Sequence, residues 1–103
     1  MIYIKVHSTD EGTILAMCDE SIINSVLDDG TVFIDIKSYS DFYRGDLVDA
    51  KRAKEFIKIN EIFSVNAVGK ESIKVAIDGA VIDKQSVKTI NGVPYAQAFK
   101  VDA

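Results

Sequence analysis

The sequence has one cysteine and one histidine, the side chains best suited to nucleophilic or acid–base chemistry near neutral pH. Cys18 ends a short apolar stretch and is followed by Asp19 and Glu20, whose negative charge disfavours a thiolate. His7 has no orienting partner within its own segment of sequence. We therefore expect Cys18 to be a buried structural residue, and we assign no catalytic residue.

The acidic residues form three pairs of sequence neighbours, Asp10-Glu11, Asp19-Glu20 and Asp28-Asp29. Each pair flanks an expected turn or helix end, where acids are common for conformational reasons. A calcium loop of the Asp-x-Asp-x-Asp type does not occur, and one Cys with one His is too few for a structural zinc site. We therefore expect no metal and no cofactor.

The segment Gly69-Lys70-Glu71-Ser72 is placed where a strand would enter a helix, as in a phosphate-binding loop. That motif needs a glycine five residues before the Gly-Lys pair and Ser or Thr directly after the lysine. Ser64 and Glu71 occupy those two positions. The segment is therefore interpreted as the start of a helix, with at most weak anion binding at its N–H groups.

An aromatic loop followed by a basic helix is the most suggestive constellation for binding. Aromatic side chains can stack on nucleobases, and lysine and arginine can contact phosphates. The predicted binding residues are Tyr39, Phe42, Tyr43, Arg44, Lys51, Arg52, Lys54 and Lys58. An acidic protein partner would suit the same basic face, and a Lys-rich helix face that is merely solvated remains the third interpretation.

Hydropathy patterning predicts the elements that position these residues. Strands are expected over 2–7, 13–18, 31–37 and 61–67, a short helix over 19–27, and a loop over 38–46. A helix capped by Asp46 or Asp49 follows that loop, and a second one begins at Gly69 and ends at Gly79. Asn91-Gly92 between apolar runs predicts a hairpin of 86–90 with 93–101.

This order predicts one α+β domain over residues 1–103, with a mixed, mostly antiparallel sheet and two or three short helices on one face. The composition, 48% hydrophobic and 27% charged, is that of an ordinary globular protein. No apolar run approaches the ~20 residues that span a bilayer, and no signal peptide is recognised. With a single cysteine, these features favour a cytoplasmic protein with no membrane contact.

The formal net charge of −4 is unevenly distributed along the chain. The first 41 residues have two lysines and eight acids, whereas residues 42–58 have five basic and three acidic side chains. The acidic total argues against a dedicated nucleic-acid binder, but the local excess of basic residues points to 42–58 as a contact surface.

Five short stretches form a recognisable series along the chain: 2–7 (Ile-Tyr-Ile-Lys-Val-His), Cys18-Asp19, Phe42-Tyr43 with Gly45, 66–69 (Asn-Ala-Val-Gly) and 92–97 (Gly-Val-Pro-Tyr-Ala-Gln). In this order and spacing, they resemble a small archaeal family, domain of unknown function 424. The family ending favours His after the proline, where this chain has Tyr95, which argues against a catalytic base there. The resemblance implies an archaeal cytosolic protein and a module that works near RNA or a ribonucleoprotein partner of translation.

Three hypotheses follow from the sequence. The first is a non-catalytic module that binds RNA, a ribonucleoprotein or a protein partner through the aromatic loop and the basic helix. The second is a small enzyme or small-ligand binder with a polar cleft formed by His7, Cys18, Tyr43, Asn66 and Gln97. The third is a homodimer joined through the edge strand near Pro94 or a helix face.

Overall fold

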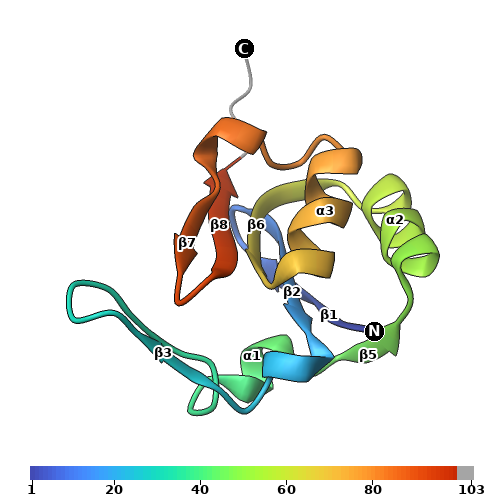
Figure 1. Cartoon of the computed structure of the whole chain (residues 1–103). Helices are drawn as coiled ribbons and strands as arrows, with labels where there is room; N and C mark the ends of the chain where they lie inside the picture. The colour runs from blue at the N-terminus through green and yellow to red at the C-terminus, as the bar shows by residue number, and fades with distance from the viewer. Residues whose placement is uncertain (100–103) are drawn as a thin grey trace.

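Apolar and polar residues alternate in the first strand, so one of its sides packs in the core, whereas the second strand is apolar from Ile14 to Cys18 and is buried on both sides at its end. In the computed structural model, which describes residues 1–99, these strands pair along their full length (Figure 1). The six-stranded sheet has the order β5-β1-β2-β6-β8-β7, with β2 and β6 parallel and the other neighbours antiparallel. Its strands are β1 (Ile2–Thr9), β2 (Gly12–Asp19), β5 (Asp46–Val48), β6 (Ile62–Val68), β7 (Lys88–Ile90) and β8 (Val93–Phe99).

Two helices cover one face of this sheet, α2 (Ala50–Ile59) and α3 (Lys70–Asp78) (Figure 1). Ala53 and Ile57 from α2, with Ile73 and Ala76 from α3, pack against the buried sheet residues of that face. Burial of these side chains is the main contribution to the stability of the domain. We call this side of the sheet the helix face.

The opposite face is partly covered by the segment between β2 and β5. This segment contains the 3₁₀ turn η1 (Glu20–Ile22), the paired strands β3 (Val26–Asp28) and β4 (Phe33–Asp35), and the short helix α1 (Ser40–Tyr43). Leu27 and Ile36 pack beside Cys18 and Val68 in a second apolar cluster. We call β3, β4 and their turn the arm, which extends beside the sheet in Figure 1.

The fold class predicted from the sequence is confirmed. The described residues form an α+β domain with a mixed, mostly antiparallel sheet and a β7–β8 hairpin. Asn91 and Gly92 both have positive φ angles, 52° and 77°, as the tight turn between these strands requires. Asp49, one of the two predicted caps, accepts a hydrogen bond from the Arg52 amide at 2.8 Å. Residues 100–101 of the predicted last strand lie outside the described residues.

The helix predicted over 19–27 is wrong. Asp19 ends β2, η1 covers only 20–22, and Val26 and Leu27 belong to a strand that pairs with β4. The apolar residues of this stretch satisfy helical spacing, but the arm needs Leu27 to pack opposite Ile34. Tertiary packing therefore overrides a weak local preference.

Two further boundaries differ from the prediction. The expected loop over 38–46 contains α1, and its last residue begins β5. Gly79 does follow α3, but its φ is −83°, and Ala80 instead adopts the left-handed conformation at 59°. Gly79 is suited to this position because a Cβ there would lie 3.0 Å from the side chain of Ile57.

Candidate functional site

The strand register places polar side chains in a row across the sheet, on the face opposite the helix face. Lys5, Ala16, Asn66 and Gln97 are successive partners in β1, β2, β6 and β8. The neighbouring row runs through Cys18, Val68, Tyr95 and Lys88 in the same way. Because side chains alternate between the two faces of a strand, Asn66 and Gln97 lie side by side on this surface.

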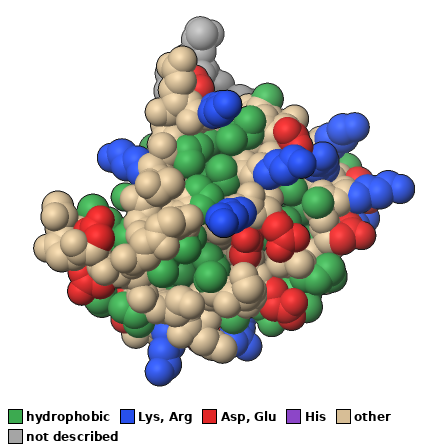
Figure 2. Space-filling view, in the orientation of Figure 1, with side chains coloured by type: hydrophobic (Ala, Val, Ile, Leu, Met, Phe, Trp, Pro, Cys, Tyr) green, Lys and Arg blue, Asp and Glu red, His purple; other side chains and the backbone are tan. Residues whose placement is uncertain are grey.

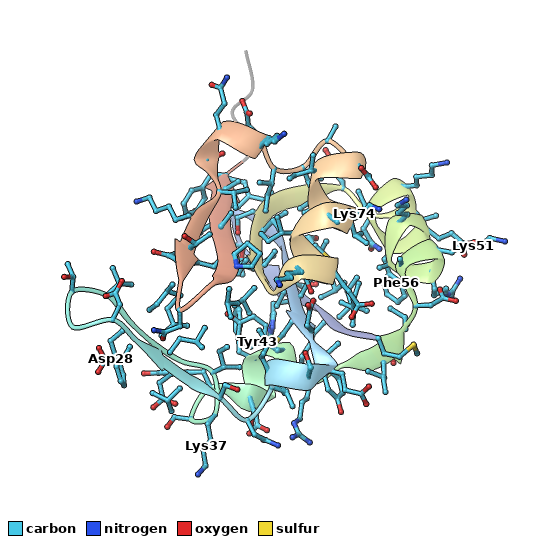
Figure 3. The ribbon with its side chains drawn as sticks, in the orientation of Figure 1. Asp28, Lys37, Tyr43, Lys51, Phe56 and Lys74 are labelled. Carbon is cyan, nitrogen blue, oxygen red and sulfur yellow. The ribbon has the colours of Figure 1, made fainter. Side chains whose placement is uncertain are left out.

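A groove of about 470 Å³ opens over the β6–β8 part of this surface. Ile34 of the arm and Tyr43 of α1 contribute to it from the covering segment, and Figure 3 shows Tyr43 where α1 meets the sheet. We call it the polar groove, and its polar and aromatic lining residues are Tyr43, Asn66, Ser86, Lys88, Tyr95 and Gln97.

A second hollow of about 390 Å³ adjoins the polar groove, since both are lined by Ile34, Tyr43 and Asn66. It extends the lining to the aromatic rings of Phe33, Tyr39 and Phe42. Tyr39 is 67% exposed, so a ligand in this hollow can reach its side chain. Together, the two hollows form a depression with several aromatic rings and one central amide.

Cys18 and Tyr43 both stay protonated at neutral pH. Burial raises the pKa of the Cys18 thiol to about 12, with a further contribution from the charge of Asp19. Burial likewise raises the pKa of Tyr43 to about 12, with Cys18 as the second cause. The Cys18 thiol donates to the Asp19 carbonyl oxygen at 3.4 Å. The cysteine is therefore buried and protonated, and its burial agrees with the expectation from the sequence.

His7 holds α1 on the sheet. Its Nε2 atom donates to the Phe42 carbonyl oxygen at 2.8 Å, and its ring stacks on that of Phe42 with centroids 4.5 Å apart. Lys5 Nζ also donates to a carbonyl of this segment, that of Asp41, at 2.7 Å. These contacts anchor one wall of the depression.

The residues of the predicted polar cleft therefore share one face of the sheet but have different roles. Tyr43, Asn66 and Gln97 line the polar groove, Cys18 is buried, and His7 contacts α1 outside the groove lining. The alternation of the strands predicts the shared face. The alternation does not predict which of these side chains are buried by the segment between β2 and β5.

The basic side chains of α2 lie on its exposed side. Lys51, Arg52, Lys54 and Lys58 are all exposed, and Lys51 points away from the protein in Figure 3. Arg52 pairs with Glu55 at 2.9 Å and lies over the Phe56 ring, while Lys54 pairs with Asp78 at 3.3 Å. Half of these basic groups are thus engaged in local contacts.

The aromatic loop and the basic helix do not form the single surface that the sequence predicted. Tyr43 packs in the cluster opposite the helix face, whereas α2 packs on the helix face. The chain crosses between them through β5, the edge strand beside β1. Arg44 also belongs to neither site, since its guanidinium lies over the Tyr3 ring and donates to Asn24 at 3.2 Å.

The amino end of α3 is occupied by a carboxylate of the chain itself. Asp19 is buried and accepts from the backbone amides of Glu71 and Ser72, at 3.0 and 2.8 Å, and from the Ser72 hydroxyl at 2.8 Å. Gly69, with φ +110°, is needed here because a Cβ would lie 2.2 Å from the Asp19 carboxyl carbon. A phosphate would compete with this internal anion for the same N–H groups.

Sequence reasoning missed Lys88 and Ser86 as groove residues. Lys88 reaches the groove because it pairs with Tyr95 across the hairpin. The Asn91-Gly92 turn fixes this register, so counting back from the turn would have found the pair. Tyr95 and Gln97 are two residues apart in β8, so the alternation of a strand predicts that their side chains lie on the same face.

Within residues 1–99, no group of three or more His, Cys, Asp or Glu side chains is arranged to hold a metal ion. None of the helices in this part of the chain is both long enough and apolar enough to cross a membrane.

A family model described as "Protein of unknown function (DUF424)" matches residues 6–101. The chain belongs to the DUF424 family. The resemblance seen in its short sequence stretches is thus confirmed over nearly the whole length. No curated protein matches this DUF424 chain.

One solved structure is similar to this DUF424 chain, the crystal structure of an uncharacterized conserved protein from Methanopyrus kandleri. The TM-score is 0.78 at 24% sequence identity, over 95% of this chain and 90% of that one. At this identity the similarity concerns the fold alone.

Proposed function

We propose that the protein is a non-catalytic binding module that holds single-stranded RNA in the polar groove. The observation that carries the proposal is the lining of this groove, in which two tyrosine rings, two amide side chains and one lysine meet. Each of these groups has a defined role in binding an unpaired nucleotide, and none of them is a reactive nucleophile at neutral pH.

The aromatic residues supply stacking surfaces. Tyr43 and Tyr95 line the polar groove, and Tyr39 and Phe42 line the hollow that continues it. A base stacked on such a ring contributes roughly 1–3 kcal/mol, whatever its sequence. Rings in two adjoining hollows therefore support binding of more than one base along the depression.

The amides supply hydrogen bonds to base edges. Asn66 and Gln97 are direct cross-strand partners, and each amide has two N–H donors and an acceptor oxygen. Asn66 is half-buried, Gln97 is exposed, and both line the polar groove, where a ligand can reach them. An unpaired base presents donors and acceptors on its exposed edges, so this pair favours single-stranded over duplex RNA.

Among residues 1–99, Lys88 is the one basic side chain that lines the polar groove. Its charge suits a phosphate, but a single contact contributes little to a counterion-driven affinity. Binding through rings and amides is therefore compatible with a chain whose net charge is −4. This distinguishes the groove from α2, where recognition would depend on several phosphates at once.

The state of the two reactive side chains supports binding rather than catalysis. Cys18 is buried with its thiol proton engaged, and the Nε2 proton of His7 is donated to a backbone carbonyl. A nucleophile needs an accessible thiolate or an adjacent base, and neither residue has that arrangement.

The test is fluorescence anisotropy of a labelled single-stranded RNA of about eight nucleotides with the full chain. Gln97→Ala removes an exposed amide of the groove and should weaken binding about fivefold, the effect of roughly one hydrogen bond. Lys51→Ala on α2 is the matched exposed control and should leave the affinity unchanged. The opposite pattern would show that the basic helix binds the RNA.

A second candidate, a small-ligand binder, is favoured by the size of the groove. Its volume of about 470 Å³ lies within the range that holds small molecules. A mononucleotide would occupy the same rings and amides but would leave the adjoining hollow empty. If a nucleoside monophosphate binds as tightly as the eight-nucleotide RNA, the small-ligand function replaces the RNA-binding one.

A further inference from the structure

A second groove lies on the helix face, away from the proposed RNA site. It has a volume of about 350 Å³ and lies along α3, beside Lys84 and Pro94. Figure 2 shows hydrophobic side chains gathered in this region with basic side chains next to them. We call it the lysine groove, and its lining residues are Lys70, Ile73, Lys74, Ile77, Asp78, Lys84 and Pro94.

The rim of the lysine groove is positive. Lys70 and Lys74 are one helical turn apart on α3, Lys84 lies in η2 (Lys84–Ser86), and all three are exposed. The acids on α3 are engaged elsewhere, since Asp78 pairs with Lys54 at 3.3 Å and Glu71 with the Met1 amino group at 3.2 Å. An apolar floor with this rim is complementary to an apolar segment that has acidic side chains.

The outer face of the arm has that chemistry. In the β3–β4 register, Asp28 pairs with Phe33 and Val26 with Asp35, so these four side chains share one face. Leu27 and Ile34, on the other face, pack in the protein. Phe33 is 62% exposed and Val26 48% exposed, and each has an aspartate as its cross-strand partner. Phe33 and Asp35 also line the hollow beside Tyr39, so a partner docked on this face would cover part of that hollow.

The arm is held in a defined shape. The Asp28 amide donates to Asn91 Oδ1 in the hairpin turn at 3.0 Å, and the Lys37 amide donates to the Ser25 carbonyl at 3.1 Å. At its tip, Asp29 Oδ1 accepts from the amides of Thr31 and Val32, at 2.9 and 2.7 Å. A preorganised arm loses little conformational entropy when its outer face is covered.

We propose that the outer face of the arm in one copy of this chain docks on the lysine groove of a second copy. Phe33 and Val26 would cover the apolar floor, and Asp28 and Asp35 would face Lys70, Lys74 and Lys84. The contact joins two different surfaces and is therefore heterologous. A dimer held by one such contact leaves one arm and one groove unoccupied, whereas a closed ring of copies occupies all of them. The charge complementarity adds specificity and speeds association.

The test is sedimentation velocity of the full chain at concentrations from about 10 µM to about 1 mM. Wild type should associate as concentration rises. A groove variant, Lys70→Glu with Lys74→Glu, and an arm variant, Asp28→Lys with Phe33→Ser, should each weaken association about tenfold or more. Lys51→Glu with Lys58→Glu on α2 is the matched charge-reversal control and should associate like wild type.

Mixing the two variants makes the test sharper. The groove variant keeps an intact arm and the arm variant an intact groove, so a one-to-one mixture should form a dimer that neither makes alone. A monomeric wild type at about 1 mM, or association that neither variant weakens, would overturn the proposal. If a variant does not fold by circular dichroism, NMR dilution of wild type decides. The NMR chemical shifts of both Phe33 and Ile77 must then change on dilution. A change at neither residue, or at only one of them, overturns the proposal.

Discussion

The carboxylate of Asp19 accepts two hydrogen bonds from Ser72, one from its backbone amide and one from its hydroxyl, both at 2.8 Å. The two residues are 53 positions apart, and both are buried. Asp19 therefore joins the end of β2 to the start of α3 and satisfies N–H groups that have no partner within the helix. This contact joins α3, on the helix face, to the end of β2. The preceding residue of β2, Cys18, packs on the opposite face of the sheet.

Replacing Gly69 by alanine should destabilise the protein strongly. The new Cβ would lie 2.2 Å from the Asp19 carboxyl carbon, at a backbone φ of +110° that disfavours a side chain. We expect a loss of about 2–4 kcal/mol in the free energy of unfolding, measured with urea. Gly30→Ala is the matched control, because Gly30 also has a positive φ, +89°, but has no atom near its Cβ position. An equal loss in both variants would show that Asp19 has no part in the effect.

Replacing Asp19 by alanine should cost about 2–4 kcal/mol, since it leaves the buried Ser72 amide and hydroxyl without this acceptor. Ser72→Ala removes only the hydroxyl bond and should cost about 1 kcal/mol. In the double variant the two losses should not add, because both changes remove the same bond. Additive losses in the double-mutant cycle would contradict the coupling.

Stability should fall in alkali. The pKa of Cys18 is raised from its ordinary 9.0 to about 12, and that of Tyr43 from 10.0 to about 12. A raised pKa in the folded state means that the unfolded chain loses its proton first. The stabilising contribution is therefore complete below about pH 9 and is lost as the pH rises towards 12. Thermal denaturation from pH 7 to 11 should show this loss, and Cys18→Ala should reduce it. A midpoint that is flat above pH 9 in wild type would contradict the prediction.

Asn91 should control the position of the arm. Its Oδ1 atom accepts from the Asp28 amide at 3.0 Å, and its φ of 52° suits asparagine. Asn91→Ala should cost about 1–2 kcal/mol and speed hydrogen exchange at the Asp28 amide. Asn91→Asp keeps an acceptor oxygen and tolerates the same φ, so exchange there should stay slow. Unchanged exchange in Asn91→Ala would show that the arm is held by other contacts.

Apart from β5, the strands of the sheet, including the terminal hairpin, were predictable because their signals are local. Alternation in 2–7 places Ile2 and Ile4 in the core, and Asn91-Gly92 fixes the hairpin turn. The stretch over 19–27 was not predictable, since Val26 and Leu27 suit a helix or a strand equally. Only the partner strand, which places Ile34 opposite Leu27, decides between them.

The candidate site was predictable in part. The alternation of β6 and β8 predicts the face that Asn66 and Gln97 share, whereas Asp19 reaches Ser72 through a contact that no local pattern encodes. The predicted joining of Tyr43 and Lys51 failed for a different reason. Eight positions separate them in sequence, but β5 lies between them at the sheet edge, and the chain changes face there.

The salt dependence of RNA affinity tests the proposed groove most directly. For single strands, the slope of log affinity against log salt is about −0.7 for each phosphate contact. Lys88 alone predicts a slope near −0.7, or about a threefold loss between 50 and 200 mM salt. The four basic residues of α2 would give a slope near −2.8, or about a 50-fold loss. A shallow slope that Lys51→Ala leaves unchanged is the predicted result, and a steep slope, or no binding at about 1 mM protein, would contradict the proposal.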